Sequence, residues 1–476
     1  MPNDPDVRPK PPRPRRRLRA LLAILLALLL SPVTAWVAWT QIEAARLDRA
    51  LDALEARHEP LNIAEFDVKP TTSEQREASH NYAQAVKLVG DATTSNVATV
   101  RKTIEDLCAV PPAKGTRTEQ IAALQSIEDR YKPALALFDR ASRLDAAGWD
   151  DADRPKRFSM EELRPRNLGL VNAVRIARLA CTGQGDPAAA ALFSTLRLRR
   201  VLTMSYYLSR SSVTTAHSLQ SVLTFTSPNP ALLQAIQQEY EAATDEPALE
   251  KHLLYSRAFW LSFTMPGVLS EPPGGYEARR ITPLEGIVTR LTRAWRDHRT
   301  LTELGEFDEA ADAARQPWPA RLDAVAALTA KYPSVRSGSM RPRLLDALTR
   351  PFGSHVSTAN LSTVVAGVAE TLARTRASVG TVAVARYRQA HHGALPASLG
   401  ELIPEYLSSP LLDPYTGKEL QYRRAGGSKY KVYSVGFNRR DDGGVWEQHS
   451  DLQSSRRGDP PDIGISVGPS PPAGRD

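Results

Sequence analysis

The residues best suited to chemistry gather in one short stretch near the end of the chain, "KYKVYSVGFNRRDDGG" at 429–444. Its first half alternates like a β-strand. Its second half contains Asn438 and the pair Asp441 and Asp442, followed by two glycines. Side-chain oxygens in a loop suit a metal site or a catalytic site, and the same residue types favour an exposed turn. The residues alone leave these interpretations open.

Motifs of known enzyme classes do not occur elsewhere in the sequence. It contains no HExxH zinc motif, no phosphate-binding glycine loop, no GxSxG and no dinucleotide-binding fingerprint. His391 and His392 precede Gly393 at the expected end of a helix, where an imidazolium ring is favoured by the helix dipole and can hydrogen-bond the last carbonyls. The sequence therefore predicts no catalytic residue and no organic cofactor.

The two cysteines, Cys108 and Cys181, lie 73 positions apart in apolar, helical-looking contexts. In an oxidising compartment they could form a disulfide, and the alternative is two buried thiols. Two cysteines without a nearby histidine pattern exclude a structural zinc knuckle.

An apolar segment near the N-terminus is long enough to cross a membrane. Ala20 to Ile42 is a run of 23 residues without a charge, and 23 helical residues extend about 35 Å. Trp36 and Trp39 lie near its distal end, and such rings prefer the headgroup region. The alternative is a signal peptide cleaved after the small residues at 33–35. In both cases the rest of the chain is exported.

The positive charge of the chain is concentrated before this segment. Residues 1–19 contain seven Lys/Arg and two Asp, so only +3 of the total net charge of +8 belongs to the other 457 positions. A basic flank before a transmembrane helix predicts a cytoplasmic N-terminus. The nearly balanced remainder does not indicate a nucleic-acid-binding surface, and we expect no nucleic-acid partner.

Helical patterns dominate the middle of the chain. The clearest is a hairpin at 168–204, in which Gly185, Asp186 and Pro187 predict a helix stop, an N-cap and a first-turn proline. Its apolar stripes must be covered by neighbouring helices. Tetratricopeptide-like repeats and an irregular bundle both satisfy this requirement.

The pattern changes near residue 355. A seam of apolar residues predicts a long helix that ends at Gly393. Short alternating segments follow, and the first two flank a pair of glycines, which predicts an antiparallel hairpin. A helix on a small antiparallel sheet is an α+β unit. The expected strands are Leu420–Arg424, Lys429–Val435 and 463–467.

A series of short motifs runs through "ARYRQAHHGALPASLGELIPEYLSSPLLDPYTGKELQYRR" and into the stretch at 429–444. It comprises a helix with a tyrosine near its end, a proline step, a leucine pair, an Asp-Pro element with a glycine, and a Tyr-Ser-x-Gly strand. In this order it resembles the C-terminal domain of the major pseudopilin of type II secretion systems, over about 380–445. The matching positions are Tyr387, Gly393, Pro396, Leu399, Leu402, Asp413, Pro414, Gly417, Tyr422, Tyr433, Ser434, Gly436 and Asp442.

The resemblance implies a calcium site. In the pseudopilins, the loop after the Ser-x-Gly strand binds calcium through acidic side chains and backbone carbonyls. The corresponding residues here are Asn438, Asp441, Asp442 and Asp451. Calcium takes six to eight oxygen ligands, so backbone carbonyls would complete the shell. The alternative is that this loop only makes a turn.

The whole chain resembles membrane-anchored helical proteins of planctomycete-type bacteria. This resemblance implies the bacterial inner (cytoplasmic) membrane, crossed once, with the bulk of the protein extracytoplasmic. The expected parts are a basic cytoplasmic tail (1–19), a transmembrane helix (20–42), a stalk and connector (43–75), a helical domain (76–350), a pseudopilin-like α+β domain (355–468) and a disordered tail (469–476).

We therefore expect a non-enzymatic scaffold or protein-interaction protein of the cell envelope, since stacked helices offer extended binding surfaces. One alternative is an accessory component of a type II secretion or pilus-like apparatus. Another is an envelope hydrolase whose site would join His217, His252 or His298 to carboxylates.

Overall fold

The described residues of the computed structural model form a mainly helical fold with one small antiparallel sheet, as the sequence predicts. The structure describes residues 14–66, 68–90, 114–146, 148–149, 164–198, 205–244, 248–264, 292–331, 358–445 and 462–468. In chain order the elements are α1 (Pro14–Ala56), η1 (Ile63–Phe66), α2 (Ser73–Val89), α4 (Lys114–Arg130), α5 (Lys132–Arg143), α6 (Arg164–Cys181), α7 (Gly185–Leu198), α8 (Ser205–Phe225), α9 (Pro230–Ala242), α10 (Ala248–Thr264), α12 (Arg293–Arg315), α13 (Ala320–Lys331), α15 (Thr358–Ala390), η3 (Leu399–Leu402), β1 (Gln421–Arg424), β2 (Tyr430–Ser434) and β3 (Ile463–Val467).

These elements belong to two compact units. Among the described residues, the smaller unit contains 14–59 and 292–305, and the larger unit contains the rest. The expected disordered tail at 469–476 lies outside the described residues, and so does most of the basic tail.

α1 is one continuous helix of 43 residues that includes the predicted membrane segment and the first part, 43–56, of the predicted stalk and connector. It is long and apolar enough to cross a membrane. Its large aliphatic side chains between Leu21 and Ile42 are 50–66% exposed. The pattern reverses in the stalk, where Leu47, Leu51 and Leu54 are buried. α1 therefore changes from a helix with exposed aliphatic side chains to a helix that is packed on one side.

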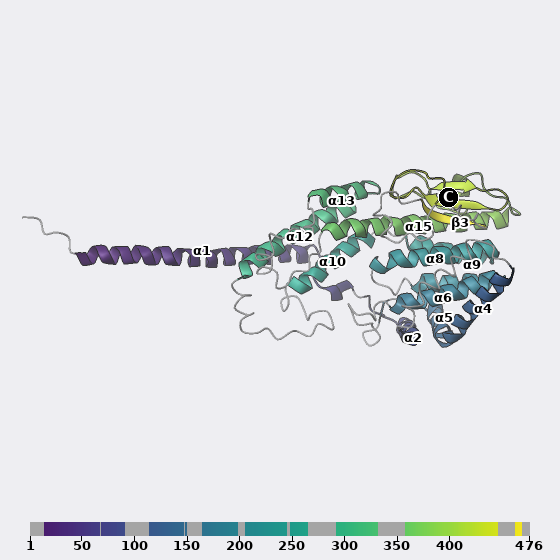
Figure 1. Ribbon diagram of the computed structural model, residues 1–476, viewed down its shortest axis with the longest axis horizontal. Helices are drawn as coiled ribbons and strands as arrows, with labels where there is room; N and C mark the ends of the chain where they lie inside the picture. The colour runs from purple at the N-terminus through teal and green to yellow at the C-terminus, as the bar shows by residue number, and fades with distance from the viewer. Residues whose placement is uncertain are drawn as a thin grey trace, which may run out of the picture. The chain divides into compact units, whose positions relative to one another are not determined.

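In the larger unit, α15 lies between the sheet and the helices α8 and α9 (Figure 1). One core cluster combines Val382 and Ala383 of α15 with Val432 and Ile465 of the sheet and Ile236 of α9. The predicted long helix and the predicted sheet are thus packed on the helical stack and share a core with it.

The remaining helices of the stack extend away from α15. α6 packs on α7 and α8, α4 packs on α6, and α2 packs on α5 (Figure 1). Tyr82 of α2 and Phe138 of α5 are fully buried. Their rings meet edge to face at 5.9 Å, a geometry that aromatic pairs prefer.

The three strands are antiparallel in the order β1-β2-β3. β2 is central, and Tyr430, Val432 and Tyr433 on it are all fully buried. Gly426 and Gly427 in the β1–β2 connection both have positive φ. The predicted hairpin and the predicted last strand are confirmed.

The prediction for the α6–α7 hairpin is wrong in detail. Gly183, with φ of 78°, supplies the left-handed stop, and Gln184 N donates to Leu179 O at 2.9 Å. Gly185 is instead the first residue of α7. Asp186 Oδ1 accepts a hydrogen bond of 2.6 Å from Asn229 N, just before α9. Asp186 thus ties two helix starts together, which a local reading of the sequence does not show.

Gly464 provides a stability test for the sheet. A Cβ at this position would lie 2.5 Å from the carbonyl oxygen of Val432, which is backbone and cannot rotate away. We expect Gly464→Ala to lower the free energy of unfolding by about 1–3 kcal/mol through overpacking. Thermal unfolding of the detergent-solubilised chain, followed by circular dichroism, measures the change.

Gly169 in α6 is the matched control, because a Cβ there would meet no atom within 4 Å. Gly169→Ala is expected to raise stability by about 0.5–1 kcal/mol through helix propensity. Equal effects of the two substitutions would contradict the assigned close approach of β2 and β3.

Candidate functional site

The loops at one end of the sheet are organised by Asp413, whose side chain is almost fully buried. Its Oδ1 accepts from Tyr415 N and Ser434 Oγ, and its Oδ2 accepts from Val435 N, each at 2.9 Å. Its carbonyl accepts from Gly417 N at 2.8 Å. A buried carboxylate is tolerated when donors satisfy it. Asp413 therefore fixes the turn before β1 to the end of β2.

Asp441 is held against the sheet directly beyond this point. Its Oδ2 accepts from Arg423 Nη2 of β1 at 2.6 Å, and its Oδ1 accepts from Tyr433 Oη of β2 at 2.9 Å. Gly443 N also donates to Oδ1, at 2.9 Å. The carboxylate thus serves as a clasp between the acidic loop and two neighbouring strands.

The other described candidates hydrogen-bond each other. Asn438 Nδ2 donates to Asp442 Oδ2 at 2.8 Å, and Asn438 Oδ1 accepts from Arg440 N at 2.9 Å. Arg439, with φ of 57°, pairs with Asp323 of α13 at 2.6 Å. This arrangement is a turn with side-chain oxygens bound to protein donors.

Asp462 is a member of the site that sequence reasoning missed. It immediately precedes β3, it is 1% exposed, and it accepts from Gly444 N at 2.7 Å and from Asp442 N at 3.3 Å. The sequence signal was an acidic residue directly before an alternating strand. Its importance depends on the β2–β3 pairing, which brings residue 462 beside the loop.

The two carboxyl groups have pKa values shifted in opposite directions. Burial alone would raise the pKa of Asp441, but the hydrogen bonds from Gly443 N, Tyr433 Oη and Arg423 outweigh it and hold the pKa below the ordinary value. The pKa of Asp462 is raised, mainly by burial and also by the carboxylates of Asp442 and Asp441, against the two backbone donors. Burial and the bond to Asp441 also raise the pKa of Tyr433.

The calcium prediction is only partly covered by the structure, because Asp451 lies outside the described residues. Within the part of the chain that is described, no group of three or more His, Cys, Asp and Glu is arranged to hold a metal ion. Asn438, Asp441 and Asp442 each bind protein donors, and Arg423 lies at the same place. The four-residue calcium site stays a prediction.

Of the two histidines after α15, His391 takes part in an aromatic cluster. His391 stacks on Tyr387 with ring centroids 3.9 Å apart, and its Nδ1 lies 2.9 Å from Tyr387 O. Tyr406 meets Tyr387 edge to face at 5.7 Å. Gly393 N donates to Arg388 O and closes the helix. The contact of His391 with a terminal carbonyl agrees with the structural role expected from the sequence.

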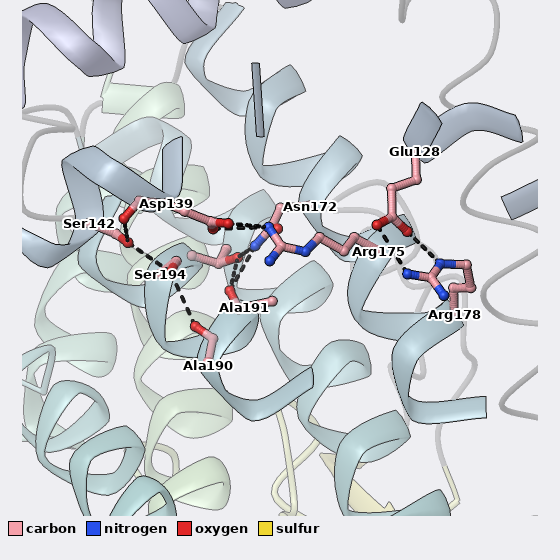
Figure 2. A network of polar contacts seen from close by, with 10 residues as sticks. Glu128, Asp139, Ser142, Asn172, Arg175, Arg178, Ala190, Ala191 and Ser194 are labelled. Carbon is pink, nitrogen blue, oxygen red and sulfur yellow. Dashed lines mark hydrogen bonds and ion pairs between the residues drawn. The ribbon is translucent and has the colours of Figure 1, made fainter. Parts of the chain in front are cut away.

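A second polar network connects the helices of the larger unit (Figure 2). Arg175 of α6 donates to both carboxylate oxygens of Asp139 on α5, at 2.9 and 2.8 Å, and Arg178 donates to Glu128 on α4. These groups are partly buried, so each guanidinium is paired with a carboxylate on a neighbouring helix.

The inner part of this network is uncharged. Ser142 Oγ donates to Ser194 Oγ at 2.8 Å, linking α5 to α7 (Figure 2). Asn172 is fully buried in α6, and its Nδ2 donates to Ala191 O and Thr195 Oγ1 of α7, both at 2.7 Å. Such buried bonds restrict how neighbouring helices can slide past each other. The network therefore holds α5, α6 and α7 in fixed positions relative to one another.

Of the three histidines considered for a hydrolase, His298 on α12 lies 3.4 Å from Glu43 on α1, between Nδ1 and Oε2. His217 lies on α8 and is half-buried. The side chain of His252 and residue Cys108 are outside the described residues, so the structure tests neither the disulfide nor the two buried thiols considered for Cys108 and Cys181.

Comparisons of the chain with protein-family models, with curated proteins and with solved structures find no match. The resemblance to the major pseudopilin therefore depends on the motifs in the sequence alone.

The clasp role of Asp441 predicts a pH-dependent effect of Asp441→Asn. A lowered pKa means that the ionised carboxylate stabilises the fold above the ordinary value of 3.8, and that this stabilisation is lost as the pH falls through the folded-state pKa. At pH 7 we expect the variant to lose about 1 kcal/mol, which is less than the usual ~1.5–3 kcal/mol for hydrogen bonds to a charged group because Asp441 and Arg423 are partly exposed. Denaturant unfolding at a series of pH values measures the loss, which should shrink in acid.

Asp442→Asn is the control in the same loop. Its amide oxygen can still accept from Asn438, and removing its charge relieves the repulsion of Asp462. We expect no loss of stability at pH 7. Equal losses in both variants that do not change with pH would contradict the clasp.

Proposed function

We propose that this chain is a membrane-anchored scaffold or protein-interaction protein of the bacterial cell envelope. The observation that carries the proposal is the surface of α1, whose large aliphatic side chains from Leu21 to Ile42 are exposed. A contiguous apolar surface of this length is unfavourable in water and matches the thickness of a bilayer. The basic residues before it favour a cytoplasmic N-terminus, and the chain after residue 42 would then lie outside the cytoplasm.

The larger unit suits a binding role because of how its surfaces are supported. Its helices are positioned by buried hydrogen bonds and interhelical ion pairs, such as Asn172 with Thr195 and Arg175 with Asp139. α15 continues the same core into the sheet. Surfaces on rigid elements bind partners without a large ordering cost. We accordingly propose protein partners and a non-enzymatic role.

A second candidate is an accessory component of a type II secretion or pilus-like apparatus, docking through the C-terminal α+β region. The hub around Asp413 favours it. Asp413, Ser434 and Gly436 belong to the motifs that resemble the pseudopilin, and they are joined by the hydrogen bonds from Ser434 Oγ to Asp413 and from Gly436 N to Ser434 Oγ. The resembling residues thus support one another as a unit.

The proposed topology predicts the behaviour of reporter fusions. Full-length chain fused at its C-terminus to alkaline phosphatase is expected to be active in the membrane fraction, and a green fluorescent protein fusion is expected to be dark. Replacing Arg15, Arg16 and Arg17 by Glu should lower phosphatase activity, because positive charge retains the flank in the cytoplasm. The same change at Arg46 and Arg49, beyond the apolar run, should not.

A bright fluorescent fusion with an inactive phosphatase fusion would contradict the topology, and recovery in the soluble fraction would contradict the anchor. The mass of the purified chain separates the anchor from a signal peptide. An intact N-terminus is expected, and cleavage after residue 35 would favour the signal peptide.

The scaffold role predicts stable neighbours in the envelope. Chemical crosslinking of the tagged full-length chain in intact cells, followed by solubilisation and mass spectrometry, should yield the same envelope proteins in replicate cultures. Mass spectrometry of the same sample also maps the crosslinked residues. Secretion components crosslinked to Lys418, Lys429 or Lys431, in the region of the sheet, would support the second candidate. The scaffold would be contradicted if the full-length chain captured no reproducible partner.

A further inference from the structure

The smaller unit contains a cluster of three tryptophans at the distal end of the apolar segment of α1. Trp36 and Trp39 are one turn apart, with ring centroids at 5.2 Å. Trp295, in the first turns of α12, meets Trp39 edge to face at 5.4 Å. Trp295 remains 50% exposed. A large aromatic side chain is therefore presented beside α1 with half of its surface available to the surroundings.

The contacts also fix the direction of α12 relative to α1 within this unit. Trp39 is beside Trp295, and Glu43, one turn farther from the apolar run, pairs with His298 at 3.4 Å. The two helices thus run in the same direction where they meet. The N-terminal turn of α12 is the part that lies nearest the apolar run.

The length of α1 sets the depth of the cluster. A hydrocarbon core of about 30 Å is crossed by about 20 helical residues. Counted from Leu21, these residues end at Thr40, so Trp36 and Trp39 occupy the last turns before the headgroups. Trp295 contacts Trp39 and has the same depth, where indole rings are favoured.

The charges around Trp295 are mainly positive. Arg293 and Arg296 have side chains that are 55% and 36% exposed, and both pair with the buried carboxylate of Asp297, at 3.4 and 3.5 Å. One carboxylate compensates two guanidinium groups only in part. The first turn of α12 contains no acidic residue, and the helix dipole disfavours cations there. An anionic surface would offset both costs, and guanidinium groups bind phosphate well.

We propose that the first turns of α12 form a second membrane contact, in which Trp295 enters the headgroup layer and Arg293 and Arg296 bind the phosphates of anionic phospholipids. The occupant of this surface is the leaflet into which α1 emerges. This inference rests on the proposed function, because it requires α1 to cross the bilayer. It adds a lipid-binding element about 250 residues away from the anchor along the chain.

Quenching of tryptophan fluorescence by brominated lipids tests the contact in nanodiscs that hold the full-length chain. The signal of Trp295 is the difference between the natural chain and Trp295→Phe. We expect this signal to fall about two-fold when the nanodisc lipids are brominated near the headgroups, as for an interfacial indole. Trp36→Phe reports in the same way on α1. Trp318→Phe, which removes a partly buried indole of the larger unit, should give a difference signal that is not quenched.

The charge contribution is tested by lipid composition. Quenching of Trp295 should be stronger in nanodiscs with phosphatidylglycerol than in phosphatidylcholine alone, and Arg293→Gln/Arg296→Gln should abolish this difference. Inorganic phosphate at equal concentration should not reproduce it, because a free ion brings no bilayer to the indole.

The outcomes separate the two proposals. Quenching of Trp36 without quenching of Trp295 would overturn the second contact and leave the anchor intact. Absence of quenching at both positions would overturn the anchor itself. Quenching of Trp295 that does not depend on anionic lipid would overturn the role of the two arginines.

Discussion

The core of the larger unit depends on α15, which is buried by the sheet and by the helices α8 and α9. Ala373, Ala377 and Ala383 are essentially inaccessible to solvent, and at Gly380 a Cβ would lie 3.1 Å from Val432 and from Leu411. Small side chains let the sheet and the helices approach the α15 backbone closely, which increases the apolar area removed from water. Because sheet and stack share this one helix, neither has a complete core without it.

The position of the sheet on α15 also determines the acidic loop. Tyr430 Oη donates to Thr381 O of α15 at 3.0 Å and fixes β2 along the helix. With β2 placed, Tyr433 of β2 and Arg423 of the neighbouring β1 donate hydrogen bonds to Asp441. The β2–β3 register then brings Asp462 under the backbone of the same loop. The loop geometry thus follows from strand pairing rather than from the turn residues alone.

This order of dependence explains what could be predicted from the sequence. The three strands, the long helix and the N-terminal apolar helix were predictable, because each is encoded by a local period or by the length of an uncharged run. The sequence pattern did not reveal the second buried face of α15, because this face contains alanines and hydroxyl residues. Ser378 and Thr381 are buried because their hydroxyls bond to the carbonyls of residues four positions earlier. A sequence pattern scores such residues as polar and assigns them to the surface.

The candidate site was predictable only in its local part. Asn438, Asp441 and Asp442 are adjacent in sequence and could be recognised together, but their partners are not. Asp462 is 20 residues from Asp442 and meets the loop only after two strands have paired. The prediction of Asp186 as a local N-cap in the α6–α7 turn was wrong for a similar reason, because Asp186 accepts a hydrogen bond from Asn229 on a later segment. Where an acidic side chain can accept from a local or a distant backbone donor, the tertiary structure decides which of the two it binds.

The end of the apolar segment of α1 is marked by a charge, because the helix itself continues without interruption to Ala56. Glu43 is the first charged residue after the run, and it is 3% exposed. A carboxylate beside an apolar medium is costly unless donors satisfy it. Trp39 Nε1 and Arg46 donate to its Oε1, and His298 of α12 lies beside its Oε2. Two of these partners are on α1 and the third is on α12. Glu43 therefore both ends the apolar run and lies against α12, so in the proposed topology the depth of Trp295 follows from where α1 acquires its first charge.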